Sequence, residues 1–328
     1  MERKIKIVVR ERSDIERAYA LKRIIKQKVE IDNRSNSNKK NIFDKGIDNS
    51  KLISIPNCDE IIIKPYTSKL IFKSLFIFLD NKLEGLRRRI TFLKVKKYIG
   101  ITLMFLRGLK IIPESKIICI NRGMDIKPGF PTFEQIISGR YLAYGRIDKL
   151  LAEANGIKVE DKIGYYNYHY KKNTIDNSVL LRPTYYSNNT NDKRVSEIIE
   201  KIGTHTFNRP KDLNRITLHP DCYEWNKVYE KQIKYNWTIE NRNSAISMSE
   251  ASIIICEISS PFFASLFLNK DIYLISRVIN KPMHFKLKKL INKYLLLIPT
   301  IDDIKDLTTK NYPEKARLAI LELKSKLF

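Results

Sequence analysis

The sequence predicts an α/β protein with two domains, and three observations predict this fold class. Short β-branched runs of strand length alternate with segments whose apolar residues follow helical spacing. The chain has 328 residues, which suits two domains of typical size. The alternation stops at "DKIGYYNYHYKKNTIDNS" and resumes at "VLLRPTYYS". We therefore expect a first domain over residues 1–166, a linker over 167–178 and a second domain over 179–328, both Rossmann-like and facing a cleft.

The elements of the first domain follow in order. Residues 5–9, "IKIVV", predict the first strand, and residues 15–28 predict a helix that Asp14 caps. A second strand is expected in "KVEID", and the polar run over 33–50 reads as an exposed loop. The runs "DEIIIK" and "KIICI" predict two further buried strands.

A basic and apolar segment covers residues 81–112. Its cations are interspersed with Leu, Ile, Phe and Met, so it predicts a basic amphipathic helix. Such a helix suits docking on anionic lipid headgroups, and the alternative is an ordinary surface helix with its apolar face in the core. The cations are Arg87, Arg88, Arg89, Lys94, Lys96, Lys97, Arg107 and Lys110.

The second domain starts with the strand "VLLRPTYYS", the helix "VSEIIEKIG" and the strand "RITLHPD", which ends in His219. The stretch "SEASIIICEISSPFFASLFLNKDIYLI" then reads as a strand, a crossover helix and a parallel strand. Ser259, Ser260 and Pro261 have the composition of a helix start. The final helix is expected in "YPEKARLAILELKSKL".

Ser259 and Ser260 have two possible roles. They follow the carboxyl end of a strand, where parallel sheets bind ligands, and the N–H groups of the next helix can hold phosphate. His219 ends a strand one βαβ step away, so we expect all three side chains to face one crevice. The alternative is that the two serines only cap the helix.

The composition indicates a polyanionic partner. The chain holds 61 Lys and Arg against 36 Asp and Glu, a net charge of +25, which suits nucleic acid, a nucleotide or an anionic membrane surface. An AT-rich coding bias toward Lys, Ile and Asn is a second source of the excess. The four cysteines are far apart, which favours neither a disulfide framework nor a zinc site and points to the cytoplasm. No secretory signal, metal-binding motif, Walker motif or GxGxxG occurs, so we expect a soluble or peripheral protein without metal or cofactor.

The order of "VLLRPTYY", "ITLHPD" and "SEASIIICEISSPFFASLFLNKDIYLI" resembles the carboxyl-terminal half of the CDP-glycerol glycerophosphotransferase family of teichoic-acid polymerases. Proteins of that family have a two-domain glycosyltransferase-B fold. The resemblance lies mainly over residues 179–280 and more weakly over 116–170. A similar pairing of His-Pro with Ser-Ser or Ser-Thr marks capsule sialyltransferases and related enzymes with cytidine-activated donors.

The resemblance assigns roles on the donor side. His219 would contact the donor pyrophosphate and help it leave, and Ser259 and Ser260 would bind the same phosphates. Arg182, in "VLLR", is assigned to the donor phosphate with them. Glu257 would hydrogen-bond a ribose hydroxyl or position the amides.

The acceptor side departs from the family pattern. Arg122 stands before Gly123 in "CINRGMDIKPG", where the family has the histidine that deprotonates the acceptor. Three explanations stay open: Asp125 or another carboxylate is the base, the acceptor is not a polyol phosphate, or the chain is a degenerate relative with little activity.

The resemblance implies an enzyme, a glycerophosphotransferase or glycosyltransferase. It would move glycerol phosphate, another phosphopolyol or a sugar from a cytidine-nucleotide donor to a membrane-linked glycan or polymer, on the inner face of the cell membrane. One alternative is a capsule or lipopolysaccharide glycosyltransferase that uses a CMP-sugar of the sialyl or Kdo type, or a UDP-sugar. A second is a basic nucleic-acid-binding protein or an inactive scaffold. Nucleic acid is the less expected partner, because the cations concentrate in apolar helical segments.

Overall fold

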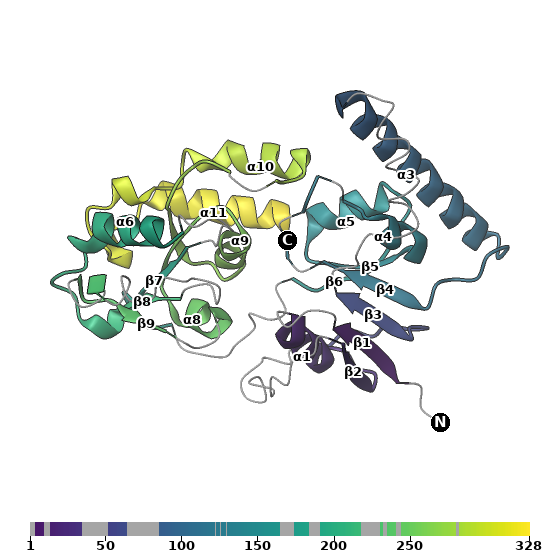
Figure 1. Ribbon diagram of the computed structural model, residues 1–328, viewed down its shortest axis with the longest axis horizontal. Coiled ribbons are helices and arrows are strands. Elements are labelled where there is room, and N and C mark those ends of the chain that lie inside the picture. Colours follow the sequence, from purple (N-terminus) through teal and green to yellow (C-terminus); the bar gives the residue numbers. More distant parts are fainter. Residues whose placement is uncertain are drawn as a thin grey trace. The chain divides into compact units, whose positions relative to one another are not determined.

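The chain forms two compact units, residues 1–167 with Phe328 and residues 168–327. Each unit is built on a parallel sheet with helices, so the predicted α/β class is confirmed for both (Figure 1). This computed structural model describes residues 4–9, 14–34, 52–63, 85–121, 123–124, 126–128, 130–164, 174–183, 191–217, 230–231, 235–240, 244–279 and 282–328.

The first unit has a six-stranded parallel sheet with the order β2-β1-β3-β4-β5-β6. Its β-branched strands are buried because helices cover the sheet, as the apolar runs predicted. The strands are β1 (Ile5–Val9), β2 (Val29–Asn33), β3 (Glu60–Ile63), β4 (Ile117–Ile120), β5 (Arg140–Ala143) and β6 (Lys158–Lys162). The helices are α1 (Ile15–Ile24), α3 (Gly85–Gly108), α4 (Phe133–Ser138) and α5 (Arg146–Glu153).

Two sequence predictions about helices of this unit are wrong. Asp14 precedes α1 without a side-chain cap hydrogen bond, and its carboxylate accepts from Arg17 Nη1 at 3.5 Å instead. The helix predicted in residues 81–112 exists as α3 but is not amphipathic. Its apolar residues lie on both sides of the axis: Leu106 is half-buried, whereas Phe105 is exposed.

The second unit has a five-stranded parallel sheet with the order β11-β10-β7-β8-β9. Its strands are β7 (Val179–Arg182), β8 (Asn214–Ile216), β9 (Thr238–Ile239), β10 (Ile253–Cys256) and β11 (Asp271–Leu274). Its α-helices are α6 (Asn191–Gly203), α8 (Ser244–Glu250), α9 (Ser260–Phe267), α10 (Phe285–Leu295) and α11 (Glu314–Leu327). Short 3₁₀ turns are η3 (Lys211–Leu213), η4 (Ile301–Asp303) and η5 (Thr309–Asn311).

The strand, helix and parallel strand predicted in residues 249–275 are confirmed as β10, α9 and β11. The position of the histidine strand was predicted less well. β8 ends at Ile216, before His219. In the chain, β9 and α8 lie between β8 and β10, and in the sheet β7 lies between the same two strands. The prediction that a single βαβ step separates His219 from Ser259 and Ser260 is therefore wrong.

Candidate functional site

The sheet of the second unit reverses its order at β7. From β7 the chain continues through β8 and β9 on one side, and then adds β10 and β11 on the other. The crevice outside the carboxyl ends of β7 and β10 is therefore a topological switch point, where open parallel sheets bind ligands. Arg182 ends β7 and lies in register with Cys256, which ends β10. The predicted donor-side residues of β7 and β10 thus come to one edge of the sheet.

The turn between β10 and α9 brings both serines to this edge. Ser259 is the N-cap of α9, is 2% exposed and has extended backbone angles, φ −151° and ψ −164°. Its side chain makes no hydrogen bond that caps the helix. Ser260 is the first helical residue and is half-buried, and Pro261 follows it. The first N–H groups of a helix have no partner within the helix, and they attract anions.

Arg182 points toward the neighbouring strand β8. The guanidinium is half-buried, and Nη1 donates to the carbonyl oxygen of Thr217 at 3.1 Å. Thr217 follows β8, and its N–H donates to the carbonyl of Leu181 at 3.1 Å. Within the described part of the chain, the buried Thr217 Oγ1 has no hydrogen-bond partner. Arg182 therefore places a positive charge between the carboxyl ends of β10 and β8.

The other polar groups near α9 are buried. Glu257 is 3% exposed, and its carbonyl accepts from the N–H of Ser259 at 2.8 Å. Burial raises the pKa of the Cys256 thiol to about 12, although a hydrogen bond with Ser265 and the charge of Arg182 act in the opposite direction. Cys256 is therefore a neutral thiol rather than a nucleophile.

Three predicted site residues lie outside the described residues: His219, Arg122 and Asp125. Gly123 is described and is buried after the carboxyl end of β4. The structure thus places four predicted donor-side residues at one edge, and of the predicted acceptor side it places only Gly123. The four are Arg182, Glu257, Ser259 and Ser260.

A buried carboxylate at the carboxyl edge of the first sheet was not predicted. Asp148 is 1% exposed and accepts from the N–H of Tyr144 at 2.7 Å, the N–H of Gly145 at 2.8 Å and the hydroxyl of Tyr141 at 3.2 Å. Burial raises its pKa to about 6, against the effect of these hydrogen bonds. Because its oxygens are used at the start of α5, Asp148 is a structural group. The signal in the sequence is its position three residues after Gly145, as in a capping box.

His284 is buried at the start of α10. The residue is 7% exposed, and its Nδ1 accepts from the N–H of Lys286 at 3.3 Å at the start of α10. Burial lowers the pKa of His284, so the neutral ring is the capping form. Among the described residues, no three His, Cys, Asp or Glu side chains are grouped as a metal site. In the same residues, no helix is long and apolar enough to span a bilayer.

No family model and no curated protein matches the chain. Among solved structures, it is similar to a putative UDP-N-acetylglucosamine 2-epimerase from Listeria monocytogenes, at 10% identity over 97% of this chain and 91% of that one, with a TM-score of 0.47. A structure of S. aureus MnaA with UDP shares 10% identity over 99% and 91% of the chains, with a TM-score of 0.42. The glycosyltransferase SnogD from Streptomyces nogalater shares 10% identity over 99% and 95%, with a TM-score of 0.36. All three TM-scores lie below 0.5.

Proposed function

We propose that the chain is a transferase that takes a phosphopolyol or a sugar from a cytidine-nucleotide donor and passes it to a membrane-linked glycan or polymer. The observation that carries the proposal is the set of donor-side groups at the switch point of the second sheet. Arg182, Glu257 and the Ser259–Ser260 turn lie at the carboxyl ends of adjacent strands, beside the start of α9.

This edge suits the phosphates of a nucleotide. The first turn of α9 offers backbone N–H groups and the positive end of the helix dipole. The Arg182 guanidinium adds charge-assisted hydrogen bonds to phosphate oxygens. As the bond to the transferred group breaks, negative charge grows on the leaving phosphate, and preorganised positive groups stabilise that change most. His219 is the residue that we assign to this step.

Two alternatives differ in the donor. A CMP-sugar or a UDP-sugar would present its phosphate to the same groups, because the contacts described above do not read the base. The cytidine assignment comes from the resemblance of residues 179–280. Measuring the binding of labelled CDP, CMP and UDP to the full chain separates these donors, and screening the hydrolysis of CDP-glycerol, CDP-ribitol, CMP-sugars and UDP-sugars identifies the transferred group.

Serine variants test the site directly. We expect Ser260→Ala to weaken nucleotide binding, because its hydroxyl holds phosphate before and during the reaction. Ser325→Ala is a matched control, since Ser325 is exposed on α11. Equal affinity of Ser260→Ala and the control, or no binding of any of the three nucleotides, contradicts a donor site here.

His219→Ala tests the mechanism. We expect turnover to fall by about 100-fold or more, with a smaller change in donor affinity, because the lost interaction strengthens in the transition state. Arg122→His is the companion variant: activity rises if Arg122 only replaces a lost base, and falls if Arg122 binds acceptor phosphate. Near-normal turnover of His219→Ala, with an unchanged circular dichroism spectrum, would reject the transferase mechanism.

A further inference from the structure

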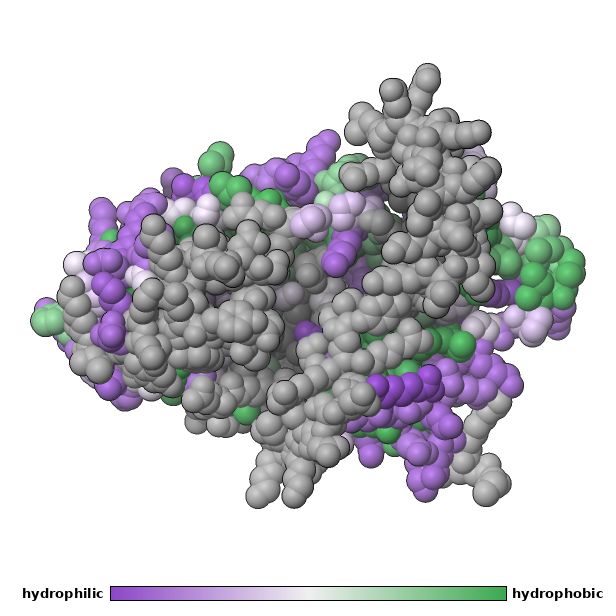
Figure 2. Space-filling view, viewed as in Figure 1, coloured by the Kyte–Doolittle hydropathy of each residue, from purple (hydrophilic) through white to green (hydrophobic). Residues whose placement is uncertain are grey.

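The carboxyl-terminal half of α3 exposes a row of large apolar side chains. Figure 2 shows hydrophobic surface gathered where this helix ends. On a helix these positions share one side, which we call the α3 outer face. It consists of Val95 (47% exposed), Tyr98 (67%), Ile101 (39%), Phe105 (62%) and Leu109 (54%).

The opposite side of α3 is fixed against its own unit. A Cβ atom at Gly100 would lie 1.9 Å from the carbonyl oxygen of Asn155, so the helix backbone packs directly on the turn after α5. Gly156 in that turn has φ +75° and approaches Gly100 equally closely, since its own Cβ would lie 2.5 Å from the Gly100 carbonyl. Near the end of α3, Nη2 of Arg107 donates to the carbonyl of Ile137. The outer face therefore cannot turn inward without breaking these contacts.

A helix that is apolar on both sides is normally covered on both sides. An exposed apolar area of this kind marks a binding surface. Charge decides between the possible occupants, because residues 85–113 contain eight Lys and Arg and no Asp or Glu. A second copy of the chain would bring the same cations together, which electrostatic repulsion opposes. An anionic bilayer matches both the apolar row and the charge.

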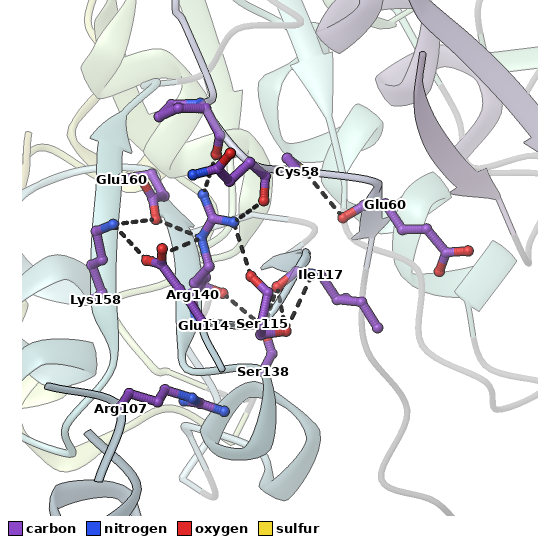
Figure 3. A network of polar contacts seen from close by, with 12 residues as sticks. Cys58, Glu60, Arg107, Glu114, Ser115, Ile117, Ser138, Arg140, Lys158 and Glu160 are labelled. Atoms are coloured by element: carbon purple, nitrogen blue, oxygen red, sulfur yellow. Dashed lines mark hydrogen bonds and ion pairs between the residues drawn. The ribbon is translucent and has the colours of Figure 1, made fainter. Parts of the chain in front are cut away.

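A cavity of about 430 Å³ lies at the carboxyl-terminal end of α3. Met104, which lies one turn after Gly100 on the inward side of the helix, lines the cavity together with Arg107, Lys110 and Glu114. Lys158, on the far wall, is ion-paired with Glu114 at 2.7 Å. Among the described residues, the buried Nε of Arg107 has no hydrogen-bond partner, and Figure 3 shows this side chain apart from the Arg140 cluster. Arg107 and the exposed Lys110 are thus the cations placed to meet a phosphate here.

We propose that the α3 outer face docks the protein on an anionic phospholipid bilayer, with a lipid phosphate entering the cavity beside Arg107 and Lys110. The apolar side chains enter the boundary between headgroups and acyl chains, and the cations stay at the headgroup level. The docking concerns the first unit alone and does not depend on the reaction proposed for the second.

Sedimentation of the full chain with vesicles tests the proposal. We expect binding to phosphatidylcholine vesicles that contain phosphatidylglycerol, weak binding to phosphatidylcholine alone, and release as salt rises. The variant Tyr98→Ser/Phe105→Ser/Leu109→Ser should lower the partition coefficient by about 10-fold or more, because it removes three apolar anchors. The matched control is Leu318→Ser/Leu321→Ser on α11, where both leucines are exposed, and we expect it to bind like the unchanged chain.

A charge variant separates the electrostatic attraction to the membrane from the insertion of apolar side chains. Lys97→Glu/Lys110→Glu should lower binding to anionic vesicles by about 10-fold or more and leave binding to neutral vesicles unchanged. Inorganic phosphate should release the protein no better than chloride at equal ionic strength. Preferential release by phosphate would indicate a site for the free anion instead.

Three further results would overturn the proposal: equal binding to both kinds of vesicle, no binding to either, or self-association in solution that the apolar triple variant abolishes. Hydrolysis of a soluble nucleotide donor reports on the second unit separately. If the triple variant loses vesicle binding but keeps that activity, membrane docking and the reaction of the second unit are independent of each other. If the chain binds vesicles but hydrolyses no donor, only the proposed function fails.

Discussion

Each of the two units buries an arginine, and their surroundings differ. Arg140, at the start of β5, is 1% exposed, and its guanidinium is enclosed by acceptors (Figure 3). Nε donates to Glu160 at 2.7 Å, Nη1 to the carbonyls of Asn57 at 2.6 Å and Ser115 at 2.9 Å, and Nη2 to the carbonyl of Pro56 at 2.7 Å. The side chain therefore ties the segments before β3 and β4 and the start of β5 to the middle of β6.

Arg215, within β8, is 4% exposed and is held mainly by charge. Its Nη1 lies 3.3 Å from a carboxylate oxygen of Glu240 and 3.0 Å from one of Glu250. Within the described residues, its buried Nε and Nη2 have no hydrogen-bond partner. Burial, and then the charge of Arg215, lower the pKa of Lys270 to about 8.

The difference shows two ways to keep a cation inside a protein. Around Arg140, neutral carbonyls and one carboxylate satisfy the donors one by one, so the group acts as a clamp between strands. Around Arg215, two carboxylates supply the charge balance, while two donors stay unsatisfied at a cost in free energy. We therefore expect the two sites to respond differently to the same substitution.

The largest effect is expected for Arg140→Met. It should lower the free energy of unfolding by about 3–5 kcal/mol, because the buried Glu160 keeps only Lys158, at 3.3 Å, as its counter-charge, and three carbonyls lose their donors. Urea unfolding followed by circular dichroism measures this. The double variant Arg140→Met/Glu160→Gln should recover part of the loss. A smaller loss than that of Arg215→Met would contradict the clamp.

Arg215→Met should cost less, about 1–3 kcal/mol, because it also removes two unsatisfied donors. The remaining cost comes from Glu240 and Glu250, which lose their counter-charge. Replacing all three groups, as Arg215→Met/Glu240→Gln/Glu250→Gln, should return stability close to that of the original chain in the same urea experiment. If the triple variant is less stable than the single one, hydrogen bonds and packing of Arg215, Glu240 and Glu250, rather than the balance of their charges, stabilise this part of the fold.

Lys270, whose pKa is lowered by burial and by the charge of Arg215, should make the free energy of unfolding depend on pH. Its pKa is about 8 in the folded state against an ordinary value of 10.5, so the unfolded chain binds more protons between these values. Stability should therefore rise with pH from about 8 to 10.5, by up to about 1.4 kcal/mol per pH unit, and the penalty is fully present below pH 8. Urea midpoints across this range measure the slope. Lys270→Met should lack this component, and an unchanged slope would rule out Lys270 as its source.

The smallest effect is expected at the exposed end of the Arg140 cluster. Glu114 has a side chain that is 44% exposed, lies 2.7 Å from Lys158 Nζ and only reaches 4.0 Å from Arg140 Nε. Glu114→Gln should change the free energy of unfolding by less than about 1 kcal/mol, as is usual for a solvent-screened pair. A loss as large as that of Arg140→Met would mean that the clamp includes this outer pair.

Local patterns predicted the strands with β-branched runs, such as β3, β4 and β10, because burial on both faces leaves that signature. The same patterns did not predict β5 and β6. β5 begins with Arg140, which reads as a surface residue, and its acceptor at Asn57 lies 83 residues away in the chain. No local pattern encodes such a partner. α3 was misread because its cations were taken as a polar face, although apolar residues occupy both sides.

The candidate site was predictable to the extent that it is local. The sequence around Ser259 and Ser260 gave the turn and the helix start correctly. The switch point, in contrast, depends on strand order: β7 lies between β8 and β10, which were predicted to be one βαβ step apart. The resemblance, and not the residue pattern, pointed to Arg182. The roles of His219, Arg122 and Asp125 stay predictions.

The Arg140 cluster and the switch point of the second sheet each lie beside a buried cysteine, whose thiol can report on local opening of the structure. Burial raises the pKa of Cys58 to about 11 and that of Cys256 to about 12, so both react slowly with alkylating reagents in the folded chain. The Cys58 Sγ donates to the carbonyl of Glu60 at 3.3 Å beside the Arg140 cluster, whereas Cys256 ends β10 at the switch point. Alkylation of each thiol, followed by peptide mass analysis, would therefore time local opening at the two places within one sample and without an added label.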